Sequence, residues 1–520
     1  MRRLVSILMT FALTTGWQVQ AQIDVTYCRA HWSFSPDAVY ISGSVTTNFK
    51  PSSAAISTID FDLSNHLRVD SVTQRGKRLS FKHKSKKLVI TLPANVEKGA
   101  TDSVSVYYHG KPVPTCFGSV DFDKNKQTAW TISEPYGARD WWPCRQNLLD
   151  KIDSMDIYVT CPVKYKVASN GVLTGYTEAG DIHTAHYRLR HPANYYTVGI
   201  AVGVFNTAEG KAELSCGDTV DIIDYYSPLD KYDDKNLRYI SNFMDFYSNY
   251  WTPYPFADEK YGQVFINSKV SIEHQTMSFL CFSDIGVMAH ELAHQWFGNY
   301  VTCGGWRNLW LNEAFATFGE LMIIERFYSD LAVEWKKYTQ QSALTSKRAI
   351  FTSDTASANL LFDVATIYNK SAMMLLMLRN EIGAEAFQKG SRSIIEQYAN
   401  GFATVDDARK CFETAADTSL TDFFDKWARG IGYPIYTVKC GKTENGKTTV
   451  NIRQITSNTS VDFYPLHVTV RLIGKEDQQK DVRLHHIKPK QDFVVETDFE
   501  VEDIVFDPES DILCKWSKRR

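Results

Sequence analysis

Residues 284–299 read Asp-Ile-Gly-Val-Met-Ala-His-Glu-Leu-Ala-His-Gln-Trp-Phe-Gly-Asn. Asp284 is of a residue type that often precedes the first turn of a helix, and Gly298 is of a type that often ends one. The stretch therefore predicts a helix over about residues 285–298.

Two histidines lie four residues apart within this predicted helix. His290 and His294 share one face, one turn apart, where their ring nitrogens can bind a single metal ion. Glu291 falls beside the ion, within reach of a water at the metal, which is where a general base should lie. With 13 histidines in 520 residues, such a pattern is expected by chance on the order of 0.02 times. The stretch therefore predicts a catalytic zinc site with Glu291 as its base.

A third ligand has to come from elsewhere in the chain, because a catalytic zinc usually takes three protein ligands and leaves its fourth position to water. Glu313 lies 19 positions after His294, at the start of the next predicted helix. A glutamate is ordinarily a solvated surface residue, but the neighbours of Glu313 are apolar: Trp306, Leu309, Trp310, Leu311 and Phe315. A carboxylate in such surroundings needs a cationic partner. We therefore expect one Zn²⁺ per chain, bound by His290, His294 and Glu313.

The chain before the zinc motif has the alternation of β structure. Gly, Pro, Asn and Asp separate short strand-like runs over 87–92, 103–109, 155–161 and 183–190. These runs indicate an N-terminal β domain over residues 22–205. Apolar residues then recur at three- and four-residue spacing over 233–251, 311–326, 365–381, 385–398 and 404–416. Residues 206–433 are therefore predicted to form a mainly helical catalytic domain.

Strand patterns return after Gly432-Tyr433-Pro434. Alternating runs cover 449–453 and 466–472, and Asn445-Gly446 is a dipeptide typical of a two-residue hairpin turn. We expect residues 434–520 to form a small β-sandwich. The predicted fold class is thus α+β with several domains.

The first residues have the zones of a secretory signal. Arg2 and Arg3 are followed by a mostly apolar run over 4–13 and by Val19-Gln20-Ala21, which is similar to a small-residue cleavage site. We therefore predict a signal peptide over 1–21 and an exported protein, periplasmic or secreted and soluble after cleavage. The alternative is a buried amphipathic N-terminus. No later run is expected to reach the roughly 20 apolar residues of a membrane span.

Composition excludes several other classes. Hydrophobic residues make up 44% and charged residues 22% of the chain, as in a globular enzyme. The net charge of -3 provides no global attraction to nucleic acid, and none is expected as a partner. The ten cysteines include no Cys-x-x-Cys pair, so a zinc ribbon or a thioredoxin-like site is not indicated. Disulfide pairing and oligomeric state stay open.

The segments 290–299 and 310–313 resemble, in residues and in spacing, the ligand motifs of the aminopeptidase N group of gluzincin metallopeptidases. That family also includes the leukotriene-hydrolase type. The similarity extends from Glu134-Pro135 to Gly432-Tyr433-Pro434, so it covers most of the chain. It implies a saddle-shaped N-terminal β domain, a thermolysin-like catalytic domain and a C-terminal β-sandwich. It also implies a metallo-aminopeptidase that hydrolyses peptides with a free N-terminus.

The resemblance implies a role for one tyrosine. Tyr368-Asn369-Lys370-Ser371-Ala372 is similar to the family's Tyr-x-Lys-Gly-Ala segment. Tyr368 is therefore the implied oxyanion stabiliser, although Ser371 stands where the family has Gly.

Two acids are implied to bind the substrate's amino group. Glu273 lies in Val270-Ser271-Ile272-Glu273-His274, which takes the place of the family's Gly-x-Met-Glu-Asn element, and Glu134 takes that of a second amine-binding acid. Val270 and His274 depart from the family residues in the segment implied to pair with substrate as an extra strand.

Other interpretations remain open on the sequence. Glu320 lies seven positions after Glu313, where it either orients a histidine ligand or is an exposed helix acid. The protein could instead be a thermolysin-type endopeptidase or an epoxide hydrolase. It could also be a noncatalytic binding module on the same scaffold, which would require damage to the ligands or the base.

Overall fold

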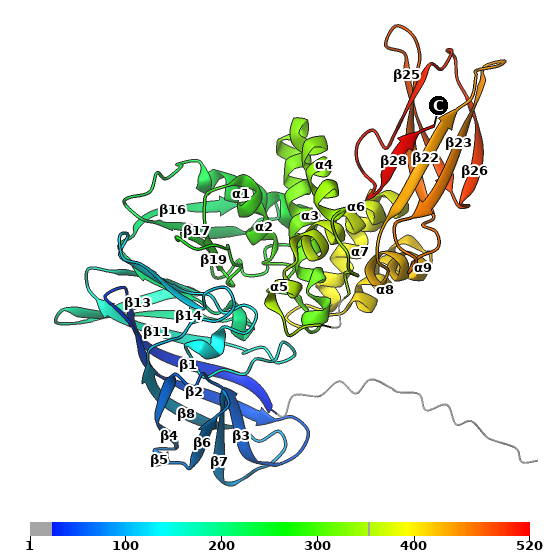
Figure 1. Ribbon diagram of the computed structural model, residues 1–520. Coiled ribbons are helices and arrows are strands. Elements are labelled where there is room, and N and C mark those ends of the chain that lie inside the picture. The colour runs from blue at the N-terminus through cyan, green and yellow to red at the C-terminus, as the bar shows by residue number, and fades with distance from the viewer. Residues whose placement is uncertain (1–22, 352–353, 520) are drawn as a thin grey trace, which may run out of the picture.

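The computed structural model describes residues 23–351 and 354–519. The predicted signal peptide over 1–21 lies outside the described residues. Three regions follow one another along the chain: a β-rich N-terminal region, a helical central region and a β-rich C-terminal region (Figure 1). The predicted α+β fold class is confirmed.

The N-terminal region contains three sheets. The largest has the order β13-β14-β11-β1-β2-β8-β4-β5, and smaller sheets have the orders β3-β7-β6 and β12-β15-β10-β9. Strands β1 and β11 pair in parallel, with Cys28 opposite Met155, which joins segments far apart in sequence. The strands and short helices are β1 (Ile23–Ser35), β2 (Ala38–Pro51), β3 (Ile56–Asp62), β4 (Leu67–Gln74), β5 (Lys77–Arg78), β6 (Phe81–Lys84), β7 (Lys87–Val96), β8 (Asp102–Gly110), β9 (Val120–Asp123), β10 (Thr128–Thr131), η1 (Ala138–Asp140), β11 (Met155–Pro162), β12 (Lys166–Ser169), β13 (Val172–Ala179), β14 (Ile182–Leu189), η2 (Tyr195–Thr197) and β15 (Ile200–Gly203).

The central region combines a mixed sheet with helices. Its sheet has the order β16-β17-β18-β19, in which β17, β18 and β19 run parallel. Helices α1 and α2 follow strands of this sheet, and α3 to α9 form the helical half of the region (Figure 1). The elements are β16 (Asn206–Glu213), β17 (Thr219–Tyr226), α1 (Asn236–Tyr250), β18 (Tyr261–Phe265), β19 (Met277–Leu280), α2 (Ile285–Ala293), β20 (Thr302–Cys303), η3 (Trp306–Asn308), α3 (Trp310–Phe327), η4 (Ser329–Leu331), α4 (Ala332–Ala343), α5 (Ala358–Leu361), η5 (Val364–Lys370), α6 (Ser371–Ile382), α7 (Ala384–Gln397), β21 (Phe402–Ala403), α8 (Val405–Ala416), α9 (Thr421–Phe424) and η6 (Asp425–Arg429).

Two predicted helices differ in detail from the structure. Helix α2 starts after Asp284 as predicted but ends at Ala293 rather than near Gly298. Beyond Ala293, the backbone N–H groups of residues 295–297 donate to carbonyls three or four residues earlier. The N–H of Gly298, at φ 140°, instead donates to Val301 O. The predicted helix over 365–381 is also not uniform, because its first part, η5, is a π-helix. Such an insertion rotates the side chains before it relative to the α-helix that follows.

The C-terminal region is a pair of facing sheets, with orders β26-β23-β22-β28 and β25-β24-β27. The rings of Tyr436 and Phe506, one from each sheet, lie 4.6 Å apart in the core between them. Asn445 and Gly446 both have positive φ and form the predicted hairpin turn between β22 and β23. The strands are β22 (Pro434–Cys440), β23 (Lys447–Thr456), β24 (Leu466–Ile473), β25 (Gln479–His486), β26 (Lys490–Glu496), β27 (Asp503–Phe506) and β28 (Lys515–Lys518).

One stretch bears on the expectation that no later run spans a membrane. Among the described residues, Ala358–Ile382 is long and apolar enough to cross a membrane by length and composition. Most of its apolar window, 67%, is buried within the protein, and α6 packs against α3. A core helix of a globular domain meets the same criteria, because a helix buried on all sides is apolar on all sides.

Candidate active site

Helices α2 and α3 present the predicted metal ligands. Asp284 caps α2, because its carboxylate accepts from the backbone N–H groups of Gly286 at 2.8 Å and Val287 at 3.2 Å. The two helices pack against each other, and the rings of Phe297 and Phe315 stack 3.8 Å apart beside them. This packing holds the two helices that present the ligands in place.

The three predicted ligands meet at one point. His290 Nε2 lies 3.0 Å from His294 Nε2, and each of these nitrogens lies 3.4 Å from Glu313 Oε2. Two ligands held tetrahedrally at ~2.0–2.1 Å from a zinc ion lie about 3.3 Å apart. The donor atoms and their spacing therefore fit a Zn²⁺ ion.

The outer nitrogen of each imidazole is already engaged. His294 Nδ1 lies 2.9 Å from Phe297 O, a carbonyl that can only accept. His290 Nδ1 lies 2.7 Å from Glu320 Oε1. With the proton on Nδ1, a neutral ring directs the lone pair of Nε2 toward the shared point. The sequence left Glu320 either as an acid that orients a histidine ligand or as an exposed helix acid. In the structure its carboxylate contacts the ring of His290.

Buried acids surround this point. Glu134 and Glu273 are each 3% exposed and Glu291 is 6% exposed. Ligand atoms of Glu273, Glu291 and His294 lie within 4.8 Å of one another. Among the described residues, one carboxylate oxygen of each of these acids and of Glu313 has no hydrogen-bond donor. Since an unpaired buried carboxylate is costly, this cluster requires cations.

The pKa values reflect the excess of negative charge. Burial raises the pKa of Glu291 to about 8, because the neighbouring histidines only partly offset it. Burial would also raise the pKa of Glu313, but His294 and His290 hold it at about 2. Burial lowers the pKa of His294, yet Glu273 and Glu313 outweigh burial and raise it to about 9. The cluster therefore attracts positive charge, either a proton or a metal ion.

Tyr368 lies on η5, beside the histidines. Its ring stacks on that of His290, with the centroids 5.9 Å apart. Burial, followed by the charge of Glu313, raises the pKa of Tyr368 well above its ordinary value, so the phenol keeps its proton and can donate. Ser371 is fully buried, and its hydroxyl donates to the backbone carbonyls of Tyr368 and Ile367. The residue that departs from the family Gly thus bonds to the turn that carries Tyr368.

Comparison with known proteins supports the same family. Residues 242–427 match the Peptidase family M1 domain. Aminopeptidase M1-C of Oryza sativa subsp. japonica is 30% identical over 347 residues, which are 61% of this chain and 38% of that protein. Aminopeptidase N of Lactobacillus delbrueckii subsp. lactis is 34% identical over 159 residues, 29% of this chain and 19% of that protein. The central part of the chain is therefore similar to the M1 peptidases, which include aminopeptidase N.

The matches also show how far the likeness extends. The matched region spans less than two fifths of the Oryza aminopeptidase M1-C. An M1 zinc metallopeptidase variant from Deinococcus radiodurans, solved with a Tyr-Ser-Ala substrate, has a TM-score of 0.72 at 24% identity, and the match covers 79% of this chain and 95% of that one. At that identity the likeness is one of fold. The fold of this chain is therefore shared with solved M1 enzymes.

Two positions that depart from the family pattern are found beside β19. Ile272 exchanges backbone hydrogen bonds with Phe279, so the segment that carries Glu273 forms a short antiparallel bridge. His274 is fully buried against the ring of Phe279, at 4.4 Å, and neither of its nitrogens has a partner among the described residues. Val270 is partly buried in the adjoining core. The departures are thus accommodated by packing.

Some residues of the site were missed in the sequence. Asn299 Nδ2 donates to Glu273 O at 2.8 Å, and Lys151 Nζ donates to Asn299 O at 2.7 Å and to Tyr300 O at 3.1 Å. Asn299 could have been found, because it is a polar residue in the apolar run after His294. Lys151 carries no such signal, since its partners are remote in the sequence and only the fold brings them together.

The cysteines give a simpler result. All ten are free thiols in the structure, and eight of them are buried or partly buried: Cys28, Cys144, Cys161, Cys281, Cys303, Cys411, Cys440 and Cys514. The site therefore uses no disulfide among the described residues.

Proposed function

We propose that the protein is a zinc-dependent aminopeptidase that removes N-terminal residues from peptides. The observation that carries this proposal is the cluster of four buried carboxylates, Glu134, Glu273, Glu291 and Glu313, around two imidazoles. A Zn²⁺ ion supplies two positive charges and a substrate ammonium supplies a third, which together offset most of the cluster's negative charge. A Zn²⁺ ion alone would leave more of the cluster's negative charge unbalanced.

His290, His294 and Glu313 would hold the metal. When bound, zinc lowers the pKa of a water to about 7 and polarises the scissile carbonyl. Glu291 accepts the proton of the attacking water and then delivers it to the leaving amine. Tyr368 donates its hydroxyl hydrogen bond to the oxyanion that develops on the carbonyl oxygen. His290 is oriented by Glu320 through its ring N–H.

Glu273 and Glu134 would bind the free amino group of the substrate. Both are desolvated and each has a carboxylate oxygen without a donor, so a charge-assisted hydrogen bond from an ammonium is strongly favoured. This contact sets the distance from the chain end to the reacting bond. The names of the relatives support the proposal, because the Oryza and Lactobacillus proteins are aminopeptidases.

The location of the protein is part of the proposal. We propose that the domains span residues 22–205, 206–433 and 434–520. We also propose that residues 1–21 are removed on export. The support for removal is the order of basic, apolar and small residues at the start of the chain. Sequencing the N-terminus of the protein recovered from the producing cell tests it: a start at residue 22 is expected.

The proposed activity is tested with metal analysis and matched peptides. The purified protein should contain one Zn²⁺ per chain, and chelation should stop turnover. Peptides with a free amine should be shortened one residue at a time, while N-acetylated copies are cut very slowly. Equal cleavage of free and acetylated peptides, with internal products, would make the protein an endopeptidase and leave the zinc site standing. An active preparation without zinc would overturn the metal assignment.

A further inference from the structure

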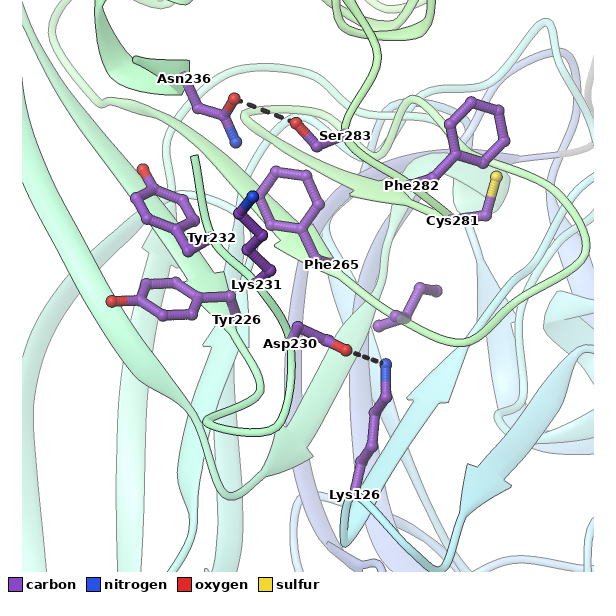
Figure 2. A pocket seen from close by; sticks show the side chains of 11 residues that line it. Lys126, Tyr226, Asp230, Lys231, Tyr232, Asn236, Phe265, Cys281, Phe282 and Ser283 are labelled. Carbon is purple, nitrogen blue, oxygen red and sulfur yellow. Dashed lines mark hydrogen bonds and ion pairs between the residues drawn. The ribbon is translucent and has the colours of Figure 1, made fainter. Parts of the chain in front are cut away.

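A cavity of about 240 Å³ lies outside the candidate active site. It opens where three parallel strands end: β17 at Tyr226, β18 at Phe265 and β19 just before Cys281, all of which line it (Figure 2). None of the proposed metal, base, tyrosine or amine-binding residues lines it. Ligands commonly bind beyond the carboxyl ends of parallel strands, because loops and helix N-termini converge there. The position alone makes this cavity a candidate for ligand binding.

The charged groups of the cavity do not cancel. Lys126 Nζ lies 2.6 Å from Asp230 Oδ1, and this ion pair closes one side (Figure 2). Lys231 also lines the cavity, and its ammonium forms no ion pair with any residue that the structure describes. The charges of the lining residues therefore sum to one positive charge, although the carboxylate of Asp224 accepts from the hydroxyl of the lining residue Tyr232 at 2.8 Å.

Asn236 adds an unused hydrogen-bond donor. It is 1% exposed and is the first residue of α1, a helix of 15 residues. Its Oδ1 accepts from Ser283 Oγ at 3.0 Å, whereas Nδ2 is buried without an acceptor among the described residues. Figure 2 shows this nitrogen turned away from Ser283, toward the side of Lys231 and the Phe265 ring. The N-terminus of α1 adds a partial positive charge at the same place.

Aromatic rings form much of the remaining wall. Tyr226 and Tyr232 stack with their centroids 4.2 Å apart, and Phe265 meets Tyr232 edge to face at 6.4 Å. Phe282, 56% exposed, stands at the rim. Such walls favour a flat apolar group. The volume admits a molecule of roughly ten to fifteen non-hydrogen atoms, at about 20 Å³ for each.

We propose that this cavity binds a small organic acid that has one carboxylate and one flat apolar group. Lys231 and the Nδ2 group of Asn236 bind the carboxylate, and the rings of Tyr226, Tyr232 and Phe265 enclose the apolar group. A doubly charged phosphate is disfavoured, because the carboxylate of Asp230 lines the same cavity.

Calorimetric titration of the full chain with 3-phenylpropionate tests this proposal. Saturable binding is expected, with 3-phenylpropanamide, the uncharged analogue, at least tenfold weaker. Lys231→Met should weaken binding of the acid by about tenfold, as expected for loss of a charge-assisted contact. Lys235→Met, an exposed neighbour that does not line the cavity, should leave it unchanged. Asn236→Asp should abolish binding, and if that variant does not fold, the result for Lys231→Met still tests the proposal.

Three results would overturn the proposal. They are absence of saturable binding, equal binding of the acid and the amide, and binding that is insensitive to Lys231→Met. N-acetyl-Ala-Ala-Phe distinguishes a free acid from the carboxyl terminus of a peptide. If this peptide binds more tightly than 3-phenylpropionate and depends equally on Lys231, carboxylate recognition stands but a small acid as the ligand is overturned.

Discussion

Glu291 and Glu313 are both buried glutamates beside the same histidines, yet their surroundings give them opposite properties. Glu313 contacts both imidazoles, and its pKa is held at about 2. Glu291 has an oxygen without a donor, and burial raises its pKa to about 8. A carboxylate that stays ionised suits a metal ligand, whereas one that gains a proton readily suits a base.

Glu291→Gln should keep the metal and lose activity. The amide has nearly the same shape, but it cannot accept a proton from water. We expect turnover to fall by roughly 10²-fold or more. Metal analysis of the variant beside its kcat separates loss of chemistry from loss of the site, and near-normal turnover would remove Glu291 from the mechanism.

Tyr368→Phe should lower kcat by roughly 10²- to 10³-fold with little change in KM, if the hydroxyl binds only the developing oxyanion. The ring keeps its stacking on His290, so the metal should stay bound. Tyr338→Phe is the matched control, because Tyr338 is 71% exposed and is not one of the proposed site residues. Equal kcat values for the two variants would contradict the proposed role.

Glu273→Ala should separate free-amine substrates from blocked ones. Loss of a desolvated carboxylate that binds an ammonium should lower kcat/KM for free peptides by roughly 2–5 kcal/mol. Acetylated peptides have no such contact, so their slow cleavage should change much less. The measurement is the ratio of kcat/KM for each pair of peptides, and an unchanged ratio speaks against amine recognition by Glu273.

At the scale of elements, the zinc helix depends on its cap. Helix α2 is short, and Asp284 satisfies two of its first N–H groups. Asp284→Ala should lower the free energy of unfolding by about 1 kcal/mol. It should also weaken zinc binding, because the same helix presents His290, and His294 is the residue at its C-terminal end. Zinc titration of the variant in competition with a chelator measures the effect.

Helix α8 offers the matched control. Thr404 and Asp407 form a reciprocal cap at its N-terminus, away from the proposed ligands. Thr404→Ala should cost a similar amount of stability but leave zinc affinity unchanged. Equal zinc affinities for the Asp284 and Thr404 variants would show that the cap of α2 does not support the metal site.

At the scale of the whole molecule, His274 lies at the junction of the N-terminal and central regions, and it should make the folded protein less stable at acidic pH. Its ring lies between Phe279 of β19 and the backbone of Gly199, where any side chain on Gly199 would collide with it. Burial lowers the pKa of His274 to about 3, whereas an unfolded chain has a value near 6.5. The unfolded state therefore binds more protons between these values, and stability falls as the pH falls through this window.

The loss attributable to His274 should reach about 2 kcal/mol between pH 8 and pH 5. Urea unfolding at both pH values measures it. In His274→Asn, whose side chain does not titrate, the difference between the two pH values should shrink by that amount. If both proteins show the same pH dependence, His274 does not control acid stability.

The sequence by itself determined what depends on neighbours along the chain. The spacing of His290 and His294 places them on one helix face, Asp284 starts that helix, and Asn445-Gly446 turns a hairpin. Each of these features is set by backbone geometry over a few residues. A local pattern is sufficient there because the interacting groups are never more than about one turn apart.

Only the tertiary structure decided what depends on distant segments. Helix α2 ends at Ala293, and a π-helix covers residues 364–370. The local sequence pattern predicted neither feature. The approach of Glu134 to the other acids and the contact of Lys151 with Asn299 join the N-terminal region to the helices. Burial and neighbouring charge, rather than residue type, separate the pKa values of Glu291 and Glu313. Desolvation and charge act through space, so they exist only once the chain has folded.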